Sequence, residues 1–163
     1  MKYFPFEHII YATHLSEKEV VAILSRSVGY KAAGSFRNGP SKAYEGIVDG
    51  NGFTISRVSK NRNSFLPQNT GTIRQDSAAT RIEVKMQLHN PVRTFLLFWC
   101  LAVTLFLIAS LMKQDQDYEE VFLAVIMLLA AYYLLVMTGF RKESKKSGRF
   151  FEKLFDAEIV LYK

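Results

Sequence analysis

The chain has 163 residues, 49% of them hydrophobic, and a formal net charge of +6 at pH 7. This length predicts one domain plus a smaller element. A single cysteine, Cys100, excludes an intramolecular disulfide, and because it lies in an apolar stretch we expect its thiol to be protonated and unreactive. The averages conceal two populations, since residues 1–93 are polar and residues 94–140 are almost entirely apolar apart from one short linker.

The N-terminal region predicts a strand followed by a helix. Phe6–His14 is rich in β-branched and aromatic residues, which favours a strand. Ser16 with Glu19 three positions later forms the pattern of a capping box. Apolar residues then recur at helical spacing, so we expect an amphipathic helix over residues 16–28 that stops at Gly29. The opening residues have neither the basic start nor the apolar core of a secretory signal peptide, so we expect this region to stay on the side where it is made.

Strand and turn signals dominate the rest of the polar region. Strands are predicted at Tyr44–Val48 and Phe53–Ser56, joined by a turn at Asp49–Gly52, because Gly and Asn accept positive φ. Arg81–Leu88 alternates apolar and polar residues, which predicts a half-buried strand. Gln68–Ile73 predicts one further strand.

Two uncharged segments are long enough to cross a bilayer as helices. Thr94–Met112 and Val121–Phe140 would each be about 30 Å long at 1.5 Å per residue. The alternative is a buried helix of a soluble domain, but so short a chain has too little polar protein to cover two such helices. The short linker Lys113–Glu120 predicts an antiparallel hairpin.

Charge predicts the orientation of this hairpin. Residues 1–93 carry thirteen basic and seven acidic side chains, the linker carries one and four, and residues 141–163 carry seven and four. Because basic residues close to a membrane favour the cytoplasmic side, we expect a multi-pass protein of the cytoplasmic (inner) membrane with both termini in the cytoplasm. The basic residues near the predicted membrane ends are Arg93, Arg141, Lys142, Lys145, Lys146 and Arg149.

The C-terminal segment predicts a helix at Ser144–Asp156 and a strand at Glu158–Tyr162. Phenylalanines cluster on one face of that helix, and the segment is too short to fold alone. It therefore packs on the N-terminal sheet or lies on the membrane surface. We favour the sheet, because a strand follows the helix.

Together these elements predict an α+β fold, in which an antiparallel, β-rich cytosolic domain with one or two packed helices is interrupted by a two-helix transmembrane hairpin. Residues 1–90 would form the cytosolic domain. Residues 91–140 would form the hairpin, with helices at about 94–112 and 121–140. Residues 141–163 would be cytosolic and complete the first domain.

Four short motifs in the polar region are distinctive: Tyr44–Gly46, Asn61–Pro67, Gly71–Ile73 and Met86–Pro91. Over residues 6–103 the sequence resembles an uncharacterised family of small bacterial membrane proteins that combine a cytosolic β-rich region with two membrane helices. The resemblance implies the same architecture. It implies no catalytic residues, because that family has no assigned activity.

Residues that could catalyse a reaction or bind a metal form no recognisable pattern. His8, His14 and His89 lack zinc-type spacing, so we expect no metal and no other cofactor. The carboxylates are not paired as acid–base catalysis requires, the serines lack a nucleophile elbow, and the glycines indicate turns and no phosphate loop. We therefore predict that the protein is not an enzyme.

One basic and amide-rich cluster is the candidate ligand-binding site. Arginine presents a planar fork of donors that suits an anionic lipid head group or another phosphate. The alternative is structural, with the bases on a solvated strand face and the amide and hydroxyl bonded to turn amides. Aromatic residues are not interleaved with the bases, so we expect no nucleic-acid binding. The candidate residues are Arg57, Lys60, Arg62, Asn63 and Ser64.

The sequence thus predicts a non-enzymatic, membrane-anchored binding or scaffolding protein whose ligand is unknown. Its expected partners are the lipid bilayer and either an anionic lipid head group or another protein. An accessory subunit of a larger membrane complex is the alternative, and an enzyme with an unrecognised site is a third hypothesis. The apolar segments contain no charge, which argues against a transport pathway.

Overall fold

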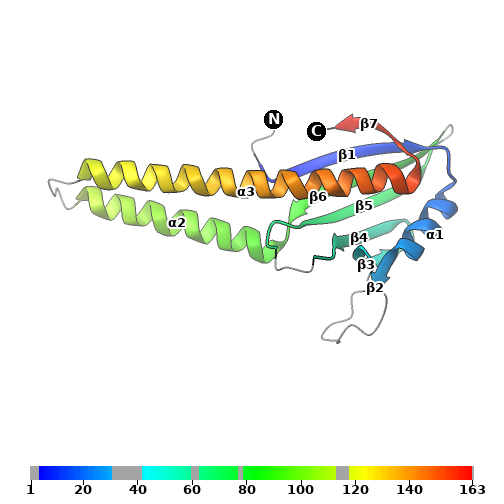
Figure 1. Cartoon of the computed structure of the whole chain (residues 1–163), viewed down its shortest axis with the longest axis horizontal. Helices are drawn as coiled ribbons and strands as arrows, with labels where there is room; N and C mark the ends of the chain where they lie inside the picture. The colour runs from blue at the N-terminus through cyan, green and yellow to red at the C-terminus, as the bar shows by residue number, and fades with distance from the viewer. Residues whose placement is uncertain (1–3, 31–41, 60–62, 77–78, 113–117, 163) are drawn as a thin grey trace.

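The computed structural model describes residues 4–30, 42–59, 63–76, 79–112 and 118–162. Within these ranges the chain forms a seven-stranded sheet and three helices, two of them long and apolar, so the fold is mixed α+β. Figure 1 shows the two long helices side by side, extending together beyond one end of the sheet. The C-terminal part of the longer helix continues along the sheet.

The strand order in the sheet is β2-β3-β4-β5-β6-β1-β7. β3 to β6 form an antiparallel meander, β1 pairs with β6, and β7 pairs with β1, again antiparallel. β2 lies parallel to β3, a pairing that the expected antiparallel sheet did not include. The other six strands are the predicted ones, with ends that differ by at most two residues. The strands are β1 (Phe6–Thr13), β2 (Val28–Tyr30), β3 (Tyr44–Asp49), β4 (Gly52–Arg57), β5 (Pro67–Gln75), β6 (Thr80–Leu88) and β7 (Glu158–Tyr162).

The alternation predicted for Arg81–Leu88 is confirmed in β6. Ile82 and Val84 are fully buried, whereas Arg81 and Lys85 are exposed on the opposite face. Since successive side chains of a strand point to opposite faces, one face of the sheet is packed and the other carries polar side chains.

Helix α1 (Glu17–Ser27) begins with the predicted capping box. The hydroxyl of Ser16 accepts a hydrogen bond from the Glu19 N–H, and the Glu19 carboxylate accepts one from the Ser16 N–H at 2.8 Å. The helix ends earlier than expected, because Val28 is already extended and Gly29 lies within β2. Val28 is β-branched and its pairing with β3 replaces a further helical turn.

The long helices differ from the prediction in one respect. Helix α2 (Asn90–Met112) begins before Thr94, with Pro91 in its first turn. Helix α3 (Tyr118–Phe155) is one continuous helix of 38 residues, so the expected end at Phe140 and new start at Ser144 are wrong. The charged residues between them are good helix formers and include no proline, so the change from apolar to charged residues marks a change of surroundings and not a helix end.

The core lies between the sheet and the C-terminal part of α3. Phe140, Phe151 and Phe155 of α3 are fully buried. The ring of Phe151 lies 5.8 Å from that of Phe53 in β4 and 6.2 Å from that of Tyr11 in β1, measured between centroids. These aromatic contacts tie α3 to the middle of the sheet.

The C-terminal strand joins this sheet. In the β1–β7 pairing, Tyr162 lies opposite Ile9 and Glu158 opposite Ala12. Thr13 also donates a hydrogen bond to the carbonyl of Phe155, at 2.7 Å, where α3 ends. Of the two placements considered for the C-terminal segment, the structure has the one on the sheet.

Both long helices are long and apolar enough to cross a membrane. Only 6% of the apolar window of α2 and 17% of that of α3 is buried within the protein. The core helix of a soluble protein would be mostly covered, so the apolar surface of these helices remains available to another phase or another chain.

Candidate functional site

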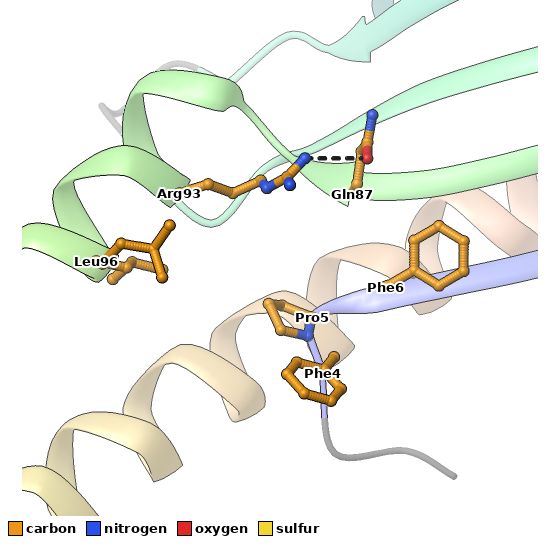
Figure 2. A pocket seen from close by; sticks show the side chains of 7 residues that line it. Phe4, Pro5, Phe6, Gln87, Arg93 and Leu96 are labelled. Atoms are coloured by element: carbon orange, nitrogen blue, oxygen red, sulfur yellow. Dashed lines mark hydrogen bonds between the residues drawn. The ribbon is translucent and has the colours of Figure 1, made fainter. Parts of the chain in front are cut away.

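A pocket of about 350 Å³ opens where the polar sheet meets the apolar helices. Three segments surround it: the chain before and at the start of β1, the end of β6, and the first turns of α2. Figure 2 shows these segments facing one another, with α3 behind them. Its lining consists of Phe4–Phe6, Gln87, Arg93, Leu96 and Leu97.

Local structure explains how Phe4–Phe6 form one wall of the pocket. The Phe6 N–H donates a hydrogen bond to the Phe4 carbonyl at 2.8 Å, which makes a tight turn around Pro5. Proline suits this position because its φ is fixed and no ladder hydrogen bond requires its N–H. The turn places Phe4 and Phe6 at the rim of the pocket, where Phe4 is 77% and Phe6 46% exposed.

Strand pairing and the start of α2 supply the polar wall. Phe6 lies directly opposite Gln87 in the β1–β6 register. Three residues after Gln87 the chain enters α2, where the N–H of Arg93 donates a hydrogen bond to the His89 carbonyl at 3.1 Å. This turn brings the guanidinium of Arg93 back toward β6, where its Nη1 donates to Gln87 Oε1 at 3.4 Å (Figure 2).

The charge in this pocket comes from Arg93. The guanidinium carries five N–H donors, and the bond to Gln87 uses one of them. Among the described residues no carboxylate forms an ion pair with Arg93. The remaining donors can therefore bind an anion that enters from the open side.

The structure places the predicted ligand-binding residue Arg57 in an internal ion pair. Arg57 ends β4, and its Nη1 donates to Oε2 of Glu143 on α3 at 2.7 Å. Lys146 donates to the other oxygen of Glu143, also at 2.7 Å. The Glu143 side chain is only 9% exposed. Burial by itself raises the pKa of this carboxyl, but the hydrogen bonds from Lys146 and Arg57 outweigh burial and hold the pKa below its usual value.

The other predicted residues lie in or near the segment between β4 and β5. Asn63 Oδ1 accepts a hydrogen bond from the Phe65 N–H at 3.0 Å, and Ser64 is exposed. Lys60 and Arg62 lie outside the described residues. Where the structure describes these side chains, it does not join Arg57 to Asn63 or Ser64, so their common ligand-binding role stays a prediction.

Sequence reasoning did not select the pocket residues as a site, apart from noting Arg93 as a base at the membrane boundary. The signal available in the sequence for this site was an arginine in the first turn of an apolar helix. The contribution of Phe4 and Phe6 requires the β1–β6 pairing, which joins residues that are far apart in the sequence.

The part of the chain that the structure describes holds no group of three or more His, Cys, Asp or Glu side chains that could bind a metal ion. Comparison with family models, with curated proteins and with solved structures found no match. The fold and the pocket therefore define the class on their own: a mixed α+β protein with two long apolar helices and an arginine-containing pocket where the two parts meet.

Proposed function

We propose that this chain is a non-enzymatic binding or scaffolding protein that α2 and α3 anchor in the cytoplasmic membrane. The observation that carries the proposal is the uncovered apolar surface of both helices beyond the sheet. Large side chains such as Phe98 of α2 and Met127 of α3 are more than half exposed. Apolar helices with satisfied backbone hydrogen bonds are stable in a bilayer, whereas in water such a surface would drive association.

Basic residues support an orientation with the sheet in the cytoplasm. Arg141, Lys142 and Lys145 follow the long apolar segment of α3, which ends at Phe140, and are exposed. Arg93 occupies the matching end of α2, which runs antiparallel to α3. Positive charge at this end of the hairpin favours the cytoplasmic side, and both termini then lie in the cytoplasm.

The continuity of α3 supports a scaffolding role. The helix passes from its apolar part directly into the sheet core, where Phe151 and Phe155 are buried. Because the helix is continuous, no flexible linker separates its apolar part from the part that packs on the sheet. A ligand or partner bound by the sheet domain would therefore be held at a defined distance from the membrane.

Cysteine labelling tests this topology. In a Cys100→Ser background, we expect Gln116→Cys in the linker to react with a membrane-impermeant maleimide added to intact cells. Ser64→Cys, which is exposed beside the sheet, should react only after permeabilisation. Labelling of both positions from one side, or release of the protein from membranes by carbonate, would contradict the proposal.

An accessory subunit of a membrane complex is the second candidate, and β7 is the observation that favours it. β7 is an edge strand of the sheet, and the side chains of Ile159 to Tyr162 are 37–60% exposed. An exposed apolar edge can pair with a strand of another protein. A protein that copurifies stoichiometrically after mild extraction, and that is lost when Val160 is replaced by proline, would favour this candidate.

A further inference from the structure

We propose that the pocket between β1, β6 and α2 binds one anionic glycerophospholipid from the cytoplasmic leaflet. This inference rests on the membrane insertion proposed above and assigns a ligand class to the pocket. The lipid phosphate binds Arg93, and one acyl chain lies along Leu97 and the phenyl ring of Phe4.

The order of residues along α2 matches the polarity of a lipid. Arg93 is in the first turn of the helix, and Leu96 and Leu97 are in the second. At 1.5 Å per residue, Leu97 lies about 6 Å deeper than Arg93 along the helix axis. A cationic donor at head-group depth followed by apolar side chains at acyl depth complements a phospholipid, whose phosphate and chains follow in the same order.

The polar wall suits a phosphate. The guanidinium of Arg93 is oriented by Gln87, which belongs to β6 and is therefore held by the sheet. This hydrogen bond leaves the other N–H groups of the fork for a ligand, and a guanidinium binds two phosphate oxygens at once. Figure 2 shows Arg93 and Gln87 on one side of the pocket and Phe4 and Phe6 on the other.

The apolar walls exclude a free phosphate as the best occupant. Phe4 is 77% and Leu97 72% exposed, although both line the pocket. An inorganic anion leaves these surfaces uncovered, whereas an acyl chain buries them. About 350 Å³ is near the lower limit for small-molecule pockets, so the glycerol phosphate and the first part of one chain fill it while the rest of the lipid stays in the bilayer.

Neighbouring charge favours an anionic over a zwitterionic lipid. Lys142 and Lys145 are exposed on α3, at the same end of the hairpin as Arg93. A choline or ethanolamine head group would bring its own cation toward these bases. A phosphatidylglycerol head group has no cation, so it gains from the same field.

Native mass spectrometry from lipid nanodiscs tests the proposal. Nanodiscs contain phosphatidylglycerol and phosphatidylcholine in equal amounts, and the amount of each lipid that remains on the protein is measured. We expect wild type to keep one phosphatidylglycerol. Arg93→Ala should lower this retention about tenfold or more, because it removes charge-assisted hydrogen bonds. Phe4→Ser should lower it as well, and since Phe4 precedes β1 and is exposed this variant leaves the core intact.

The matched control is Lys142→Ala, which removes the same charge at the same membrane boundary but outside the pocket. Its retention of phosphatidylglycerol should fall much less than that of Arg93→Ala, because Lys142 acts only through its field and forms no hydrogen bond to the phosphate. An equal loss in this control, equal retention of the two lipids, or no effect of Arg93→Ala would overturn the proposal. Arg93-dependent binding of inorganic phosphate to the lipid-free protein would also overturn it, because the site would then recognise phosphate alone.

The labelling experiment separates this inference from the proposed function. Correct topology without a retained lipid rejects the lipid site and leaves the membrane-anchored protein in place. Failure of the topology rejects both.

Discussion

Glu143 on α3 joins the helix to the sheet through an ion pair with Arg57. It is a buried carboxylate on α3 whose two partners come from β4 and from α3 itself, each at 2.7 Å. A buried carboxylate is stable only with such partners, and removing one member leaves the other without its counter-charge. Arg57, predicted from the sequence as a ligand donor, therefore has a structural contact that joins the two layers.

The pH dependence of stability tests this contact. The folded-state pKa of Glu143 lies below its ordinary value of 4.5, so the contact contributes stability above that pH and loses it as the pH falls through the folded pKa. We expect Glu143→Gln to lower the free energy of unfolding by about 1–2 kcal/mol at neutral pH. The loss of stability below pH 4.5 should also be smaller in the variant, as measured by thermal unfolding in nanodiscs. Glu158→Gln, which changes an exposed carboxylate on β7, should keep the wild-type profile, and an unchanged profile in Glu143→Gln would refute the assignment.

At the scale of elements, α3 contacts the segment between β4 and β5 through a glycine. A Cβ atom added at Gly139 would lie 2.8 Å from the ring of Phe65. Side chains in proteins do not approach this closely, so the ring occupies space that only glycine leaves free. This contact holds the segment between β4 and β5 against α3, next to the point where the apolar part of the helix ends.

A double-variant cycle measures this contact. Gly139→Leu should displace Phe65 and destabilise the protein by about 1–3 kcal/mol, as overpacking usually does. In Gly139→Leu with Phe65→Ala, the leucine can occupy the vacated space, so the combined loss should be smaller than the sum of the two single losses. Strict additivity of the unfolding free energies would show that the two positions do not interact.

At the scale of the whole molecule, the strands run alongside α3 (Figure 1). Two copies could join their β7 edges as antiparallel strands only about a two-fold axis perpendicular to those strands. Such an axis also reverses the direction of the second pair of long helices. Two copies inserted in one bilayer with the same orientation therefore cannot form this antiparallel dimer, and an antiparallel strand that pairs with β7 under that condition would come from a different protein.

Disulfide crosslinking tests this restriction. With Val160→Cys in a Cys100→Ser background, we expect no crosslinked homodimer when oxidant is added to intact membranes. Solubilisation in detergent removes the common orientation, so a dimer that forms only then agrees with the geometry. A crosslinked homodimer in intact membranes would contradict either the orientation or the free edge.

Local patterns in the sequence were sufficient for most elements of the fold. The alternation in β6, the capping box at Ser16 and the two apolar segments each depend on residues within a few positions of one another. The period of two in a strand and the spacing of a helix are properties of the local backbone. These elements could therefore be predicted from the sequence alone.

Contacts between distant residues were decided only by the tertiary structure. The Arg57–Glu143 ion pair, the packing of Phe65 on Gly139, and the pocket formed by Phe4 and Arg93 each join segments separated by many residues. Such contacts depend on which strands pair and on where α3 crosses the sheet, and no local period encodes either. The continuity of α3 depends on both levels, because the helix formers after Phe140 allow the helix to continue and burial of Phe151 and Phe155 against the sheet stabilises its C-terminal part.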